Sequence, residues 1–223
     1  VRFLETLSGV EGLIPDPGYE GSGVHLTGDG GVLAVHHDFN YMLCDVASGV
    51  FSGCRRPNPH AAATAQRVQL HRRVNVFVYL NHDWPDAYGG HLELWARNMS
   101  RCEARIRPAL GRFAVFSSTD FSFHGHPTPL RLPPGRMRRS IAFYYYTTGR
   151  PADECEDGDC GTFRNAVWQR LGAGCASCLA CAAATAAADE PVAAAARRRL
   201  APPQLAPRRG AAAAAPAAAA RRA

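Results

Sequence analysis

The chain contains an apolar run at residues 32–41 that ends abruptly in ionisable side chains and limits its fold more than any other stretch. Four aliphatic residues lead into His36, His37 and Asp38. Successive side chains of a β-strand point to opposite faces, so His36 and Asp38 lie on one face and His37 on the other. The run predicts a strand that delivers an imidazole and a carboxylate side by side. A strand that merely leaves the core through a polar turn has the same pattern.

A second imidazole is available much later in the sequence. Residues 114–126 form a β-prone run that closes on His124 and His126. Two imidazoles and one carboxylate make the facial triad that holds non-haem Fe(II) and leaves coordination positions open. Both histidines lie on one face of a continued strand, so the spacing alone does not choose between them.

A further β-prone run, residues 138–146, opens with two arginines. An arginine at the start of a buried aromatic strand needs an anionic partner, because an unpaired buried charge is costly. A carboxylate is its natural partner, since the guanidinium fork binds it through two parallel hydrogen bonds. We therefore expect Arg139 to have a carboxylate partner.

Five motifs, in this order, resemble the prolyl 4-hydroxylase-like branch of the Fe(II)/2-oxoglutarate dioxygenases. They are His36-x-Asp38 and residues 74–81, 89–95, 123–127 and 139–146. The resemblance covers about residues 1–148. It implies a mainly β fold, a double-stranded β-helix (jelly-roll), with a flanking helical segment.

The resemblance also implies the site residues. His36, Asp38 and His124 would bind the iron, and His124 is preferred to His126 because the family ligand directly follows an aromatic residue. Arg139 would bind the distal carboxylate of 2-oxoglutarate, with the hydroxyl of Tyr79 as a helper. The neighbouring arginines at 136 and 138 lack the Ser-Ile-Ala-Phe sequence that follows the family's arginine directly.

The implied reaction is hydroxylation of a C–H bond, with 2-oxoglutarate and molecular oxygen consumed and succinate and CO2 released. The implied substrate is a prolyl residue in a peptide or protein. Fe(II) is the implied cofactor, and the resemblance leaves room for ascorbate as a reductant. Three alternatives stay open: the same chemistry on a free amino acid or small molecule, a non-catalytic β-helix binding module, and an interaction protein acting through its tail.

Composition divides the chain into an oxygenase domain (1–150), a cysteine-rich linker (151–190) and an Ala/Arg/Pro-rich tail (191–223). The tail lacks the apolar variety needed to order, so it is expected to be disordered. Seven of the 25 basic residues lie there with no acidic residue, leaving 18 basic and 19 acidic residues before it. This balance argues against a nucleic-acid-binding face on the body and leaves one open for the tail.

Five of the eight cysteines follow residue 150. Cys175, Cys178 and Cys181 form two overlapping C-x-x-C units, and Cys155 with Cys160 would complete a four-thiolate zinc site. Disulfides are an alternative, and a linker with neither zinc nor disulfide is the default expectation.

Local patterns predict the remaining elements. A helix is expected to end at Gly9, and a strand at 24–27 is expected to return through a hairpin turn at 28–31. Residues 44–72 read as an irregular polar loop, either a lid or an insertion. Within 74–81, the valines should share one face, and the opposite face should look into the interior.

Two adjacent residues of a turn-rich loop, His82 and Asp83, are not expected to bind metal. No run of about 18 apolar residues predicts a transmembrane helix. No signal peptide is visible, which weakly favours the cytoplasm, but the chain opens at Val1 in mid-pattern and the localisation is left open.

Overall fold

The computed structural model describes residues 1–58 and 67–169. Its helix and strands are α1 (Arg2–Ser8), β1 (Ile14–Pro15), β2 (Gly23–Thr27), β3 (Leu33–His37), β4 (Tyr41–Ala47), β5 (Val50–Arg55), β6 (Val68–Tyr79), β7 (Leu92–Trp95), β8 (Cys102–Ile106), β9 (Phe113–Ser117), β10 (His124–His126), β11 (Arg138–Thr147) and β12 (Val167–Trp168). Three single turns of 3-10 helix complete the elements: η1 (Asp86–Tyr88), η2 (Ala152–Glu154) and η3 (Glu156–Gly158).

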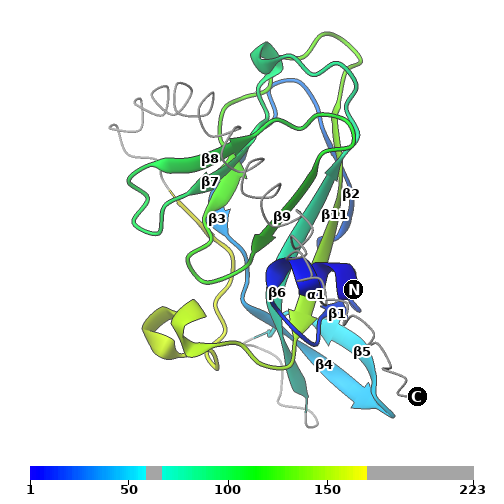
Figure 1. The fold of residues 1–223 in the computed structure, drawn as a ribbon, viewed down its shortest axis with the longest axis vertical. Helices are drawn as coiled ribbons and strands as arrows, with labels where there is room; N and C mark the ends of the chain where they lie inside the picture. The colour runs from blue at the N-terminus through cyan, green and yellow to red at the C-terminus, as the bar shows by residue number, and fades with distance from the viewer. Residues whose placement is uncertain (59–66, 170–223) are drawn as a thin grey trace, which may run out of the picture. The chain divides into compact units, whose positions relative to one another are not determined.

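Within those two ranges the strands form two antiparallel sheets. The larger has the order β1-β11-β6-β4-β5, with β2 added to β11 and β9 added to β6; the smaller has the order β12-β3-β10-β7-β8. The long strands β6 and β11 pair along the middle of the molecule, and β3, β7 and β8 lie beside them as a second layer (Figure 1). The expected mainly β, jelly-roll fold is confirmed.

Strand β6 separates two packing environments. Val74 and Val76 pack against Leu4 of α1 and Leu13 on the outer face. On the opposite face, Tyr79 clusters with Leu92 and Ala114 between the sheets. The alternation predicted for this run is therefore confirmed, and the inner face of β6 points into the space between the two sheets.

Helix α1 ends where the sequence predicted. Gly9 adopts a left-handed conformation with φ 72°, and its N–H donates to the carbonyl of Glu5 at 2.8 Å. Glycine takes this conformation without a Cβ clash, which is why it terminates the helix.

The turn at 28–31 does not make the expected hairpin. Strand β2 pairs with β11, where Leu26 faces Arg139, whereas β3 pairs with β10 in the other sheet. The turn itself forms, since the N–H of Gly31 donates to the carbonyl of Gly28 at 3.1 Å. A turn signal fixes the reversal of the chain, but the partner of each strand depends on contacts with distant residues.

The prediction of an irregular loop over 44–72 is wrong for its described part. Strands β4 and β5 form a hairpin, and β4 and the start of β6 are paired. Ser48 and Gly49 at the hairpin turn have φ of 50° and 78°, the positive values of a type I′ turn. A disulfide between Cys44 and Cys54 joins the two strands. The central residues 59–66 lie outside the described chain.

The folded body continues past residue 150. The short strand β12 pairs with β3, and Cys155 forms a disulfide with Cys160. These two cysteines are therefore neither in a four-thiolate zinc site nor in an unstructured linker. Cys175, Cys178 and Cys181, like the whole tail, lie outside the described residues. No helix in the described part is long and apolar enough to cross a membrane.

Candidate metal centre

The smaller sheet brings together the two histidines and the aspartate that the sequence singled out. Strands β3 and β10 are adjacent, and His36 is directly opposite His124 in their register. Asp38 follows the end of β3. The Nε2 atom of His36 lies 3.7 Å from Asp38 Oδ1, and that of His124 lies 3.6 Å from Asp38 Oδ2. One ligand atom from each residue falls within 4.8 Å of the others.

Both imidazoles are oriented by the backbone. The Nδ1 of His36 lies 2.9 Å from the carbonyl of Ala34, and that of His124 lies 2.9 Å from the carbonyl of Ser122. A carbonyl only accepts, so each Nδ1 carries the proton and each Nε2 keeps a free lone pair directed at Asp38. This is the tautomer a metal ligand needs.

A glycine lets the two histidine strands approach. Gly125 separates His124 from His126, and a Cβ at this position would lie 2.7 Å from the carbonyl oxygen of Leu33 and 2.9 Å from that of Ala34. Any larger residue would push β10 away from β3 and draw His124 away from His36.

Protonation favours metal binding. Burial lowers the pKa of His124 to about 4, so this imidazole is neutral at neutral pH. Burial alone would raise the pKa of Asp38, but the guanidinium of Arg72 and the imidazoles of His124 and His36 outweigh it and hold that pKa well below its usual value. A neutral imidazole and an ionised carboxylate are the forms that ligate a cation.

A buried network holds the carboxylate. Arg72 NH2 lies 3.2 Å from Asp38 Oδ2, and Asn75 Nδ2 donates to the same oxygen at 2.7 Å. Arg72 Nε donates to Asn75 Oδ1 at 2.9 Å, which closes the network. The guanidinium is stacked 3.4 Å from the ring centroid of Tyr144 and 5.2 Å from that of Phe39.

Sequence reasoning placed Asn75 on the inner face but assigned no contact to it, and it missed Arg72. The available signal was an arginine inside a strand that is otherwise buried, because such a charge needs a buried partner.

A cavity of about 310 Å³ opens beside His124 between the two sheets. It is lined by His25, Leu26, Thr27, Val32, Leu33, Phe77, Tyr79, Leu92, His124, His126, Arg138 and Ser140. Within the described chain, three buried polar atoms of this wall have no hydrogen-bond partner: the Tyr79 hydroxyl, His126 Nδ1 and Ser140 Oγ. An apolar cavity with a few convergent polar groups is the usual form of a small-molecule site.

The arginine in this cavity is Arg138, which is 5% exposed. Its Nε donates to the carbonyl of Gly90 at 2.8 Å, and its guanidinium carbon lies 5.1 Å from the ring centroid of Tyr79. Gly90 has φ 68°, and a Cβ there would lie 2.9 Å from Arg138 Cδ, so only glycine fits. Burial lowers the pKa of Arg138, as expected for a buried cation that has no carboxylate partner among the described residues.

Arg139 lies on the other face of β11. It is exposed, and it lines a separate surface pocket with His82 and Arg136. The pairing of Ser140 with Tyr79 sets the register of β11 and turns Arg138, two residues before Ser140, to the inside. This placement corrects the expectation for Arg139, whereas Tyr79 lies where the sequence placed it.

His82 and Asp83 lie away from the residues that could bind metal. Both are exposed in the loop before η1, and neither belongs to that set.

His126, by contrast, lines the cavity next to His124. Burial, with a further effect from Arg138, lowers the pKa of His126 to about 3. It is therefore a neutral group of the cavity wall.

Fe(II) fits this donor set. Two imidazoles and one carboxylate with directed lone pairs could hold the metal as a facial triad, and the adjacent cavity has an arginine without a carboxylate partner among the described residues. A jelly-roll fold with such a donor set is typical of one class of protein, the non-haem iron proteins that have a two-histidine, one-carboxylate site.

Comparison with known proteins gives the family. The profile of the 2OG-Fe(II) oxygenase superfamily matches residues 22–146, more than half of the 223 residues. The chain therefore belongs to the 2OG-Fe(II) oxygenase superfamily, whose members use Fe(II) and 2-oxoglutarate. No curated protein matches it.

Three solved structures are similar to parts of the chain. The first, a prolyl hydroxylase from Trichoplax adhaerens in complex with a hypoxia inducible factor oxygen degradation domain peptide fragment, is 28% identical over 34% of this chain and 31% of that one, with a TM-score of 0.29. A prolyl 4-hydroxylase from Phytophthora capsici is 20% identical over 55% and 30%, with a TM-score of 0.34. A Pseudomonas putida prolyl-4-hydroxylase is 21% identical over 55% and 48%, with a TM-score of 0.33. The chain thus spans about a third to a half of the length of these proteins.

Proposed function

We propose that this chain is an Fe(II)- and 2-oxoglutarate-dependent dioxygenase that hydroxylates a C–H bond of a prolyl residue in a peptide or protein. The observation that carries the proposal is the cluster of His36, Asp38 and His124 beside a cavity that contains Arg138. A module that only binds a partner would need neither the directed imidazoles nor a buried arginine that lacks a carboxylate partner among the described residues.

The three ligands have distinct electrostatic tasks. His36 and His124 offer Nε2 lone pairs to Fe(II) because their Nδ1 protons are held by backbone carbonyls. Asp38 supplies the negative charge, and it stays ionised because Arg72 and Asn75 bind its Oδ2 atom. Bound Fe(II), with 2-oxoglutarate and oxygen, supplies the oxidising power for C–H hydroxylation, and the co-substrate leaves as succinate and CO2.

The cavity residues would bind the co-substrate. Arg138 takes the distal carboxylate through its guanidinium, since a buried guanidinium pairs best with a carboxylate in a bidentate contact. Tyr79 lies next to Arg138, and its hydroxyl can donate a hydrogen bond to the same carboxylate. Burial raises the pKa of Tyr79 and so keeps the phenol protonated. Phe77 and Leu92 form an apolar part of the cavity wall, which limits the entry of water.

A prolyl substrate is supported by the motifs that resemble the prolyl 4-hydroxylase-like branch, from His36-x-Asp38 to residues 139–146. The named solved proteins are prolyl hydroxylases, and one of them is bound to a peptide fragment. Ascorbate, as a reductant that keeps the metal in the ferrous state, is part of the same proposal.

The test is succinate release by protein loaded with Fe(II) under anaerobic conditions and then given 2-oxoglutarate and oxygen. The assay is run without a substrate, with a proline-rich peptide, with free proline, and with or without ascorbate. We expect succinate formation to be stimulated by the peptide and to vanish in Asp38→Ala, which lacks the carboxylate ligand.

Stimulation by free proline alone would replace the peptide with a small-molecule substrate. Absence of succinate in every arm, from folded and iron-bound protein, would reject catalysis in favour of a binding module. Failure to bind iron would reject the triad itself.

A further inference from the structure

The segment after the last long strand returns to the metal-binding strand. Residues 161–169, here called the strap, run antiparallel to residues 35–41. Gln169 N–H donates to the carbonyl of Val35 at 2.7 Å, and β12 pairs Trp168 with His36 and Val167 with His37. The strap therefore forms an edge strand beside His36, which lies on β3, and beside Asp38, which directly follows β3.

The strap is held along its whole length. Asn40 exchanges two hydrogen bonds with Arg164, one through its N–H to the Arg164 carbonyl at 3.1 Å and one through its Oδ1 from the Arg164 N–H at 2.9 Å. Asn40 Nδ2 also donates to the Thr162 carbonyl at 2.8 Å, and Tyr41 hydroxyl to that of Gly161 at 3.1 Å.

Trp168 makes an aromatic contact with the first metal ligand. The rings of Trp168 and His36 have centroids 4.5 Å apart at an angle of 38°. The other two tryptophans, Trp84 and Trp95, are 4% and 5% exposed, whereas Trp168 is 56% exposed. An indole so exposed contributes little to the core, and the aromatic contact that it makes within the described chain is with the imidazole of His36.

We propose that Trp168 is a positioning residue of the iron site, which holds the imidazole of His36 in the orientation that a metal requires. The Nδ1 contact to Ala34 fixes one edge of the His36 ring, and the rings of His124 and Trp168, each with its centroid 4.5 Å from that of His36, pack against it. The ring of Trp168 restricts the remaining rotation of the imidazole. Ligand orientation set by residues around a metal is worth a large factor in affinity. The inference rests on the metal site of the proposed function.

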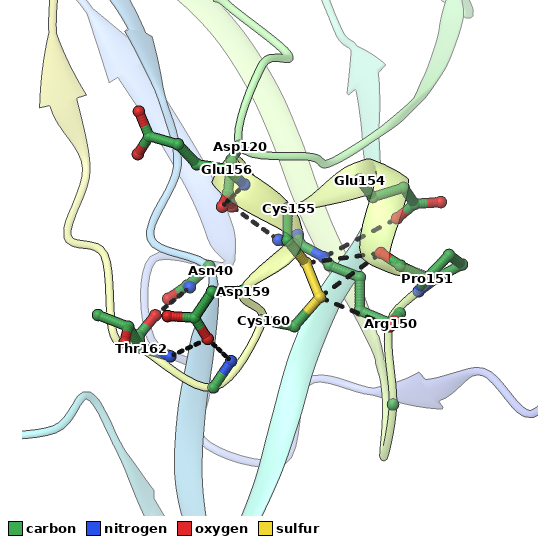
Figure 2. The surroundings of a disulfide bond; sticks show 12 residues. Asn40, Asp120, Arg150, Pro151, Glu154, Cys155, Glu156, Asp159, Cys160 and Thr162 are labelled. Atoms are coloured by element: carbon green, nitrogen blue, oxygen red, sulfur yellow. Dashed lines mark hydrogen bonds and ion pairs between the residues drawn. A yellow bond between two sulfur atoms is a disulfide. The ribbon is translucent and has the colours of Figure 1, made fainter.

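A disulfide-closed loop anchors the strap to the domain (Figure 2). Cys155 and Cys160 close the loop that contains η3, directly before the strap. The buried carboxylate of Asp120, in the connection that leads to His124, accepts from the Glu156 N–H at 3.0 Å and lies 2.8 Å from Arg150 NH1. We call this loop, residues 155–160, the clip.

The family profile ends at residue 146, before the clip and the strap. The strap therefore lies outside the residues that the family profile matches. Because the clip leads directly into the strap, breaking the disulfide should loosen the strap and weaken the contact between Trp168 and His36 without changing any metal ligand.

Anaerobic titration with Fe(II) tests the inference on the full chain. We expect Trp168→Ala to bind Fe(II) roughly three- to tenfold more weakly, the size of a lost aromatic pair. Trp168→Phe, which keeps a ring over His36, should restore most of the affinity. Val167→Ala is the matched control, because its side chain lies on the opposite face of the same strand, and it should bind Fe(II) like the unchanged chain.

The double variant Cys155→Ser with Cys160→Ser tests the clip. Without Fe(II), acrylamide should quench Trp168 fluorescence more strongly than in the unchanged chain, with Trp168→Phe identifying the signal of Trp168. The Fe(II) affinity should fall as it does in Trp168→Ala. Combined with Trp168→Ala, the clip variant should cause no further loss, since both changes remove the same contact.

Each opposite result overturns the inference: equal Fe(II) affinity in Trp168→Ala and the unchanged chain, an equal loss in Val167→Ala, or additive losses in the combined variant. Iron-bound protein that releases no succinate would overturn the proposed catalysis alone. A chain that fails to bind Fe(II) would overturn the metal site and this inference together.

Discussion

The iron-binding carboxylate depends on a single buried cation. Arg72, on β6 of the larger sheet, contacts Asp38, which follows β3 of the smaller sheet, and their side chains are only 3% and 12% exposed. Removing one partner of such a pair leaves an uncompensated charge, which is far more costly than the pair itself is stabilising. A divalent metal at the site offers Asp38 a second source of positive charge.

We therefore expect Arg72→Met to destabilise the metal-free protein by about 3–5 kcal/mol. Part of this loss should be recovered on addition of Fe(II), so that the metal stabilises the variant more than the unchanged chain. Denaturant unfolding with and without anaerobic Fe(II) measures both effects. Arg67→Met is the control, because the Arg67–Asp45 pair is partly exposed and should be worth about 1 kcal/mol or less. Equal metal stabilisation of both proteins would contradict the role of Arg72.

The two neighbouring arginines of β11 are predicted to differ sharply. Arg138→Met should weaken 2-oxoglutarate binding roughly 100-fold, because a charge-assisted bidentate contact is lost in a buried site. Arg139→Met should leave that affinity within about twofold, since its side chain is exposed on the opposite face. Anaerobic titration of the iron-bound protein with 2-oxoglutarate measures both. Fe(II) affinity should stay unchanged in each variant, and the reverse order of effects would return the role to Arg139.

At the scale of secondary-structure elements, strand β6 carries ionisable groups into the core. Burial, with smaller effects from Arg150 and Arg73, lowers the pKa of His71 from its ordinary value of 6.5 to about 4. The unfolded chain therefore binds a proton at a higher pH than the folded chain does. Stability from this group is complete above about pH 6.5 and is lost as the pH falls toward 4.

We expect the free energy of unfolding of the metal-free protein to decrease between pH 7 and pH 4.5 with a contribution from His71 of up to about 3 kcal/mol. His71→Asn, which cannot take up a proton, should show a shallower decrease by about one proton over this window. Urea unfolding at a series of pH values measures the slopes. Parallel slopes in the two proteins would mean that His71 is not buried as a neutral group.

Element boundaries show where local signals suffice. The Ser48-Gly49 pair carries the positive φ values of a tight hairpin turn, so the β4–β5 hairpin had a local signal that the polar composition of the region obscured. The turn at 28–31 had an equally clear signal, yet it connects strands of two different sheets. Turn chemistry is local, whereas strand pairing is not.

For the whole molecule, the contacts of the site include residues beyond the domain boundary expected at residue 150. The strap supplies them, through Gln169 and Trp168. The domain boundary that the sequence predicted at residue 150 would separate β11 from the clip.

The two disulfides of the described chain are of a kind that persists in oxidising compartments, whereas the cytoplasmic location remains a prediction from sequence.

A chain truncated after Gln169 should keep the Fe(II) affinity and the succinate release of the full chain, which would assign the activity to the body. A chain truncated after Arg150 should bind Fe(II) more weakly, because β3 loses its edge strand and His36 loses its aromatic neighbour. Comparison of Fe(II) titrations for the three lengths tests this. Loss of turnover in the 1–169 chain would instead favour a protein that acts through its tail.

The sequence alone determined the features that follow from the geometry of one strand or one turn. Alternation placed His36 and Asp38 on one face and put Asn75 and Tyr79 on the inside of β6, and Gly9 stopped the helix. These outcomes depend only on backbone stereochemistry and on the burial of apolar side chains. The ordered motifs added the family.

Only the tertiary structure decided which distant residues meet. Arg138 rather than Arg139 entered the cavity because the register of β11 against β6 turned it inward. Arg72 reached Asp38, and Trp168 reached His36, across separations that carry no periodic signal. Register and sheet order come from the packing of the whole core, so a shift of one residue would exchange every inward and outward side chain while leaving the local pattern unchanged.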